Sequence, residues 1–191
     1  MDLVMGVFSA FGLSASAGLN AYIPLLAVAL LGRFTNLIHL SSPWDAITSW
    51  WVIGALVVLS IIEFFADKVP AVNHINDIIQ TFIRPAAGAV LFAASAKVIS
   101  DVHPIFAMVL GVLVAGSVHA VKSVAVRPAV TATTAGTANV PVSIAEDVVS
   151  TIVSVISVVL PALVVLFGIL FVSWVIWLMW RRANRATRAR I

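Results

Sequence analysis

Residues 3–31 contain no charged side chain, and most of them are apolar. As a single helix this run would be about 43 Å long, whereas the hydrocarbon core of a bilayer is about 30 Å thick. The run is also too long and too uninterrupted for a barrel strand, which alternates over about 10 residues. The composition is also that of a membrane protein. Of the 191 residues, 62% are hydrophobic and only 10% are charged, whereas about 25% are charged in soluble domains. The sequence therefore predicts an α-helical integral membrane protein.

Two polar segments interrupt the apolar sequence, one in each half of the chain. Residues 12–20 are rich in Gly and Ser and are followed by Pro24, and residues 131–139 are rich in Thr and are followed by Pro141. Irregular backbone in hydrocarbon must face protein or a wet cavity, because its polar groups cannot stay unpaired. We therefore expect two broken or re-entrant segments that meet deep in the bilayer, a pattern typical of transport sites.

The remaining apolar runs complete an all-α membrane bundle of about five or six transmembrane helices. Residues 50–65, 86–100 and 104–126 read as spans, and residues 142–180 would measure about 58 Å as one rod, so a bend near Pro161 is expected. Residues 70–83 have apolar side chains at helical spacing and polar side chains on the other side, which predicts an amphipathic helix lying in the interface or capping the bundle. Residues 1–180 form a single transmembrane domain.

Short internal similarities favour an inverted repeat. Ile83-Arg84-Pro85-Ala86 matches Val126-Arg127-Pro128-Ala129, and the segments at 17–24 and 135–141 are loosely alike. Ala107, Gly111 and Ala115 recur at every fourth position, a spacing that lets helices approach closely.

The basic residues at the C-terminus indicate topology. Five arginines lie in residues 181–191, directly after an apolar run that contains Trp174, Trp177 and Trp180. Such a cluster is the positive-inside signal, so the tail is expected in the cytoplasm and the protein in the inner (plasma) membrane as a multi-pass chain. The cluster is expected to contact anionic lipids, and no nucleic-acid partner is expected.

Charged side chains within or beside the spans are the candidate functional residues, because such charges are costly in a membrane and are usually functional or paired. Arg84, Lys122 and Arg127 are basic candidates for a phosphate or carboxylate, with Asn20, Thr134 and Asn139 as polar residues of the two breaks. Glu63, Asp67, Glu146 and Asp147 are candidates for carrying protons or a coupled cation. Each set has an alternative role. The basic residues could anchor helix ends at the membrane surface, and the acidic residues could simply be neutralised by nearby positive charges.

Asp147 begins a polar stripe that continues through Ser150, Ser154 and Ser157. Such a stripe is expected either in the wall of a hydrated path or in a helix–helix contact made by small hydrogen-bonding residues. Both readings fit the sequence.

Several kinds of chemistry lack support in the sequence. The chain has no Cys, and its four His have no metal-ligand spacing. Hydrolase and nucleotide-binding signatures are missing as well. We therefore expect no catalytic residues, no metal and no cofactor, and not an enzyme.

Three stretches resemble a known family: GLSASAGLNAYIPLL at 12–26, EFFADKVPAVNHINDIIQTFIRPAAG at 63–88 and HAVKSVAVRPAVTATTAGTANVPVSIAEDVVS at 119–150. They are similar to a bacterial family of small integral membrane proteins filed as a domain of unknown function (DUF, number forty-one twenty-six). The resemblance covers most of the chain.

The run from Arg127-Pro128 through Ala135-Gly136 to Pro141 also resembles, more distantly, a re-entrant segment of the DedA (VTT-type) proteins, which are implicated in moving lipid phosphates across bilayers. This resemblance implies two re-entrant hairpins, with Arg127 on the phosphate and an acid for proton coupling. Asn20 stands where that family has its first-hairpin acid, so the acidic role falls to Glu63 or Glu146.

These observations predict a small secondary transporter or lipid-phosphate translocase for an anionic substrate, proton- or cation-coupled. The alternatives are a passive ion or small-solute channel and a non-transporting membrane scaffold. The expected partners are membrane lipids, the anionic substrate and further copies of the chain in a homo-oligomer.

Overall fold

A computed structural model describes residues 3–68, 70–96 and 103–188, and all of the regular structure in these ranges is helical. The helices are α1 (Leu3–Leu19), α2 (Tyr22–Phe34), α3 (Trp50–Ala66), α4 (Pro70–Ala96), α5 (Pro104–Ala120), α6 (Arg127–Thr134), α7 (Asn139–Val159) and α8 (Pro161–Arg188). A short 3₁₀ helix, η1 (Trp44–Thr48), precedes α3, and a π-helical segment, η2 (Val121–Val126), joins α5 to α6.

Within the described ranges, four helical segments are long and apolar enough to cross a membrane. They are Ile75–Ser95, Pro104–Thr134, Asn139–Val159 and Pro161–Arg181. The helices at Val4–Leu19, Tyr22–Phe34 and Trp50–Ala66 are apolar but shorter. These features indicate a multi-pass membrane protein, as the sequence predicts.

The first expected break is much shorter than residues 12–20. Residues 12–19 are helical, and the chain leaves the helix only at Asn20 and Ala21. The Asn20 Oδ1 atom accepts hydrogen bonds from the backbone N–H groups of Tyr22 (3.0 Å) and Ile23 (3.1 Å), and so satisfies donors at the start of α2. The Gly and Ser residues before Asn20 serve helix packing instead of a loop.

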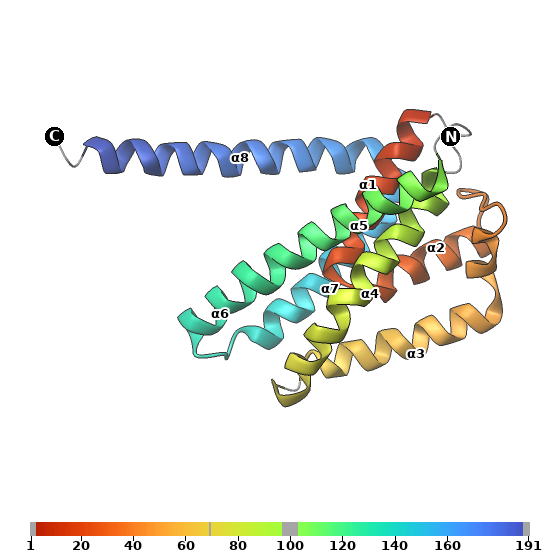
Figure 1. Cartoon of the computed structure of the whole chain (residues 1–191), viewed down its shortest axis with the longest axis horizontal. Coiled ribbons are helices and arrows are strands. Elements are labelled where there is room, and N and C mark those ends of the chain that lie inside the picture. Colours follow the sequence, from red (N-terminus) through yellow and green to blue (C-terminus); the bar gives the residue numbers. More distant parts are fainter. Residues whose placement is uncertain (1–2, 69, 97–102, 189–191) are drawn as a thin grey trace.

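The second expected break is a turn at the tip of a helical hairpin. The helical run that begins at Pro104 continues to Thr134, and the chain reverses at residues 135–138, where Ala135 and Gly136 have φ of 50° and 85°. Thr133 and Thr134 are helical, and their hydroxyls are satisfied within the helix by donating to the carbonyls of Ala129 (2.8 Å) and Val130 (2.7 Å). Figure 1 shows α6 and α7 meeting at this turn, well away from the middle of the bundle. The expectation that residues 12–20 and 131–139 form a shared cavity is therefore wrong.

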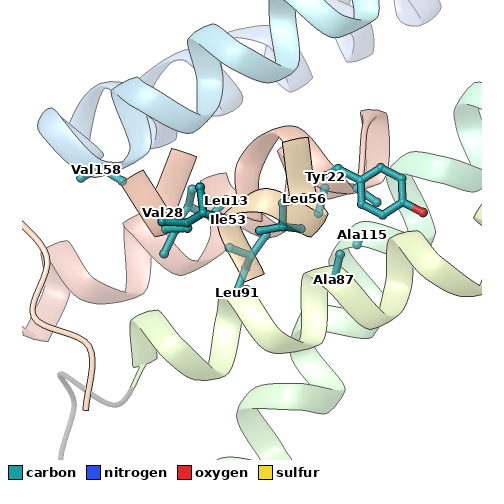
Figure 2. Packing of buried hydrophobic residues seen from close by; sticks show 12 residues of the cluster. Leu13, Tyr22, Val28, Ile53, Leu56, Ala87, Leu91, Ala115 and Val158 are labelled. Atoms are coloured by element: carbon teal, nitrogen blue, oxygen red, sulfur yellow. The ribbon is translucent and has the colours of Figure 1, made fainter. Parts of the chain in front are cut away.

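The core lies around α1, which packs against α4, α5, α7 and part of α8. Leu13, Val28, Ile53 and Leu91 converge there, as Figure 2 shows. Burial of such side chains stabilises the bundle where helices face one another.

Helices α4 and α5 approach closely because glycines face each other. A Cβ atom built on Gly111 would collide with the carbonyl of Gly88 and would lie 2.7 Å from the Cα atom of Ala89. Ala107 and Ala115, on the same face of α5, are buried as well. The close helix approach predicted from this spacing is confirmed.

The serine stripe of α7 packs against α1. The Oγ atom of Ser16 is hydrogen bonded to the hydroxyls of Ser150 (2.8 Å) and Ser154 (2.7 Å), and all three side chains are fully buried. Of the two readings open to the sequence, the structure supports the helix–helix contact.

The expected interfacial helix at 70–83 is the first half of α4, which continues through Pro85 to Ala96. Its apolar side chains Ile75, Ile79 and Phe82 are exposed, whereas Gln80 and Arg84 are buried. The helix is therefore inside-out, with its polar face against the protein. A separate amphipathic helix is a wrong prediction, because periodicity shows two faces without showing which one points inward.

Helix α8 extends away from the bundle after the predicted bend at Leu160-Pro161 (Figure 1). None of the most apolar 18-residue stretch within Pro161–Arg181 is buried against the protein. The basic tail predicted at 181–191 prolongs this helix to Arg188, and residues 189–191 lie outside the described residues.

Candidate functional site

A π-helical segment positions two of the site's cations. Pro128 lacks an N–H and its ring conflicts with an α-helical carbonyl one turn earlier. The chain adopts the wider π turn at Val121–Val126 directly before it. Such turns occur often at functional sites. Here the turn directs Lys122 into the protein interior and leads to Arg127 at the start of α6.

Arg127 is held by carboxylates from three helical regions. Its Nη2 atom donates to Asp67 Oδ2 (2.9 Å), just after α3, and to Glu146 Oε2 (3.1 Å) on α7. Its Nη1 atom lies 3.6 Å from Asp77 Oδ2 on α4. Arginine suits this role because its planar guanidinium has five donors in a fixed arrangement.

Lys122 joins the same group from the opposite direction. Its Nζ atom lies 2.8 Å from Glu146 Oε2 and donates to the backbone carbonyl of Leu19 at 2.9 Å. Leu19 is the last residue of α1. The lysine therefore ties the end of α1 to the second turn of α7.

A second ion pair lies deeper in the bundle. Arg84 is fully buried and donates through Nη2 to Glu63 Oε1 at 3.0 Å. Its Nη1 atom lies 3.1 Å from His119 Nδ1. Arginine can only donate, so Nδ1 accepts and the His119 ring carries its proton on Nε2.

The neighbouring threonine fits this tautomer. Thr81 Oγ1 donates to the carbonyl of Asp77 (2.8 Å) and lies 3.1 Å from His119 Nε2. The Nε2–H group therefore donates to Thr81, and His119 is neutral. Three buried atoms of this region have no hydrogen-bond partner among the described residues: Glu63 Oε2, Gln80 Oε1 and Arg84 Nε.

Asn20 and Asp147 connect the α1–α2 break to α7. The Asn20 Nδ2 atom donates to Asp147 Oδ1 at 2.9 Å. The other oxygen, Oδ2, lies 3.5 Å from Lys68 Nζ. Asn20 thus caps α2 with its oxygen and fixes Asp147 with its nitrogen.

Asp67, which follows α3, is the most heavily bonded acid in the network. It accepts from Arg127, from Asn76 Nδ2 (2.7 Å) and from the Ser143 hydroxyl (3.2 Å). Burial alone would raise the pKa of this carboxyl, but the positive charges of Arg127, Lys122 and Arg84 and the Asn76 hydrogen bond outweigh burial and lower it.

The structure brings most of the side chains selected from the sequence into one region, where they form three bonded groups that we together call the ion network. The groups are Arg127 and Lys122 with Asp67, Asp77 and Glu146; Arg84 with Glu63 and His119; and Asp147 with Asn20 and Lys68. Thr134 and Asn139 do not belong to it. Asn139 accepts from the exposed Thr131 hydroxyl at 3.1 Å, and Thr134 bonds within the hairpin turn.

Lys68, Asp77 and His119 were not selected as site residues from the sequence, and Lys68 entered only as a nearby charge that could neutralise Glu63 and Asp67. Lys68 follows Asp67 directly, and Asp77 lies on the polar face of the helix that begins at Pro70. Both could have been found by asking which charges share a helix end or face with the chosen acids.

An apolar groove reaches the ion network from one side; we call it groove 1. Its cavity has a volume of about 540 Å³, within the range of small-molecule sites. Val118 and Val121 line one wall, Ala145 and Val149 the other, and Phe171 of α8 contributes as well. Lys122 and Glu146 supply charged groups to an otherwise apolar surface.

Each cation of the network faces a carboxylate. An anion entering groove 1 must therefore take Lys122 from Glu146, or meet Glu146 in its protonated form. Among the described residues, no group of three or more His, Asp or Glu side chains is arranged to hold a metal ion.

Comparison with known proteins identifies the family. The chain matches the family model described as Domain of unknown function (DUF4126) over residues 7–181, and it belongs to that family. No curated protein and no solved structure matches the chain.

Proposed function

We propose that this member of the family is a secondary transporter of an anionic amphiphile, such as a lipid phosphate, coupled to protons. The observation that carries the proposal is groove 1, an apolar cavity of about 540 Å³ that ends at the buried Lys122–Glu146 pair. Apolar walls suit a hydrocarbon tail, and the lysine suits its anionic head.

Buried ionisable groups give the second support. Charges within a membrane protein are costly and usually mark a path for ions or substrate. Here Glu146 contacts both Lys122 (2.8 Å) and Arg127 (3.1 Å). Protonation of Glu146 would free Lys122 for a phosphate while Arg127 keeps Asp67 and Asp77, which couples anion binding at Lys122 to proton uptake. Glu63, Asp67 and Asp147 are the other acids able to take part.

The distant likeness of the Arg127–Pro141 run to the DedA proteins points to the same ligand chemistry. In this chain Arg127 is bonded to two carboxylates, Asp67 and Glu146. We therefore assign Lys122, which lines groove 1, as the first contact of the headgroup and Arg127 as the next.

The two alternatives have less support. A passive channel would use the serine stripe as its wall, yet Ser150 and Ser154 are buried against α1. A non-transporting scaffold would have no use for charged groups at the end of an apolar cavity. A homo-oligomer remains an expectation, and native mass spectrometry of the detergent-solubilised protein would measure it.

The test is transfer of a fluorescently labelled alkyl phosphate between the leaflets of proteoliposomes at several pH values. We expect transfer in the wild type, and a loss of at least about tenfold in Lys122→Gln, equivalent to about 1.4 kcal/mol. Arg33→Gln is the control, because Arg33 is exposed and donates to the carbonyl of Thr48, outside the network. Transfer that is absent from the wild type, or unchanged in Lys122→Gln, would refute the proposal.

A further inference from the structure

A second apolar groove reaches the ion network at the neighbouring residues; we call it groove 2. Its cavity has a volume of about 260 Å³. It is lined by Asn20, Ile23, Ser60, Ile61, Phe64, Phe65 and Asp147.

The two grooves are separated by residues that are consecutive in the chain. Leu19 and Glu146 line groove 1, whereas Asn20 and Asp147 line groove 2. Two short contacts close the wall between them, from Lys122 Nζ to the Leu19 carbonyl (2.9 Å) and from Asn20 Nδ2 to Asp147 Oδ1 (2.9 Å).

Groove 2 repeats the chemistry of groove 1. In groove 1, Lys122 pairs with Glu146; at groove 2, Lys68 lies 3.5 Å from Asp147 Oδ2. The Lys68 Nζ atom also lies 3.3 Å from the centre of the Phe64 ring, another residue that lines groove 2. Groove 1 is lined by both members of its pair, whereas groove 2 is lined by Asp147, and Lys68 contacts its lining residues Phe64 and Asp147.

Polar atoms in groove 2 have bonding capacity left over. Ser60 Oγ is buried and has no hydrogen-bond partner among the described residues, whereas Asp147 Oδ2, which also lacks a hydrogen bond, lies 3.5 Å from Lys68 Nζ. Buried polar atoms are nearly always bonded, so an unbonded hydroxyl that lines a cavity points to a ligand. The Ser60 hydroxyl and the Lys68 ammonium are donors that suit a phosphate.

We propose that groove 2 is a second subsite for an anionic amphiphile of the alkyl-phosphate class. The tail lies along Ile61, Phe64 and Phe65, and the head receives hydrogen bonds from Lys68 and Ser60. The ligand class rests on the proposed function, whereas the existence of a second subsite does not. Asn20 and Asp147 then lie between two binding subsites, groove 1 and groove 2, on one ligand path.

Cysteine protection tests this proposal in the full-length protein in nanodiscs, because the natural chain has no Cys. Single reporters are placed by Ile61→Cys in groove 2 and Ala145→Cys in groove 1. Dodecyl phosphate at ten times its Kd is expected to slow maleimide labelling about tenfold at both reporters. Dodecanol and inorganic phosphate, each lacking one half of the amphiphile, are expected to protect neither.

Two substitutions separate the subsites. Lys68→Gln is expected to abolish protection at position 61 and to leave protection at position 145. Ser60→Ala removes a hydroxyl without a partner, so folding is unaffected; it is expected to weaken protection at position 61 alone.

Three results would overturn the proposal. Protection at position 145 but not at position 61, in reporters that carry neither Lys68→Gln nor Ser60→Ala, refutes the second subsite and leaves the proposed function standing. Protection at neither position refutes both. Protection by dodecanol or inorganic phosphate equal to that by dodecyl phosphate refutes the ligand class.

Discussion

The Nη2 atom of Arg127 lies 2.9 Å from Oδ2 of Asp67, so an arginine at the start of α6 is bonded to the residue that ends α3. Helix α3 buries few side chains of its own, namely Ile53, Leu56 and Glu63. Its ionic contacts at Glu63 and Asp67 therefore supply much of its attachment to the bundle.

Removal of Arg127 should lower stability as well as activity. Arg127→Met would leave the buried Asp67 carboxylate without its ion-pair partner and Glu146 with Lys122 alone, and breaking a buried pair costs about 3–5 kcal/mol. Thermal unfolding in detergent measures the effect, with Arg33→Met as the exposed control; equal melting temperatures in both variants would contradict it.

Asp67 should give the protein an acid-sensitive contribution to stability. Its folded pKa is lowered, so the carboxylate stabilises the folded state above the unfolded pKa of about 3.9 and loses this effect as pH falls through the lower folded value. Melting temperatures from pH 7 down to pH 3 should fall less steeply in Asp67→Asn than in the wild type, from a lower value at pH 7. Parallel curves would contradict the assignment.

The α4–α5 contact should tolerate no added methyl group. Gly111→Ala places a Cβ atom against the backbone of Gly88 and Ala89, and overpacking of this kind costs about 1–3 kcal/mol. Gly54→Ala is a matched control, because a Cβ at Gly54 meets nothing within 4 Å. Chemical or thermal unfolding should separate the two, and a neutral Gly111→Ala would show that the helices lie farther apart.

Asn139→Ala should leave ligand binding unchanged. Asn139 is bonded to the exposed Thr131 at the tip of the α6–α7 hairpin, outside the ion network. Surface changes of this kind usually alter stability by no more than about 0.5 kcal/mol. The affinity of this variant for dodecyl phosphate, measured by fluorescence competition, should equal that of the wild type. A clear loss of affinity would show that Asn139 and its turn belong to the ligand site.

The sequence predicted the helical membrane class, the bend at Pro161 and most of the charged residues of the network. The charges could be selected singly, because each is costly in an apolar chain. Their pairing could not be derived, since Asp67 and Arg127 meet only through the packing of α3, α4 and α7. The Thr-rich run at 131–134 is predicted as a break because Thr has low helix propensity, whereas in the structure it continues the helix from Pro104, with the hydroxyls of Thr133 and Thr134 bonded to carbonyls four residues earlier.

The buried Glu63–Arg84 pair also bears on how the chain enters the bilayer during synthesis. Glu63 lies near the end of α3, and Arg84 lies in the middle of α4, the next helix to emerge. An unpaired arginine at the centre of a helix, such as Arg84, carries an insertion cost of roughly 2.5–3.5 kcal/mol. The two helices are therefore expected to leave the translocon together, as one unit in which each supplies the counter-ion of the other.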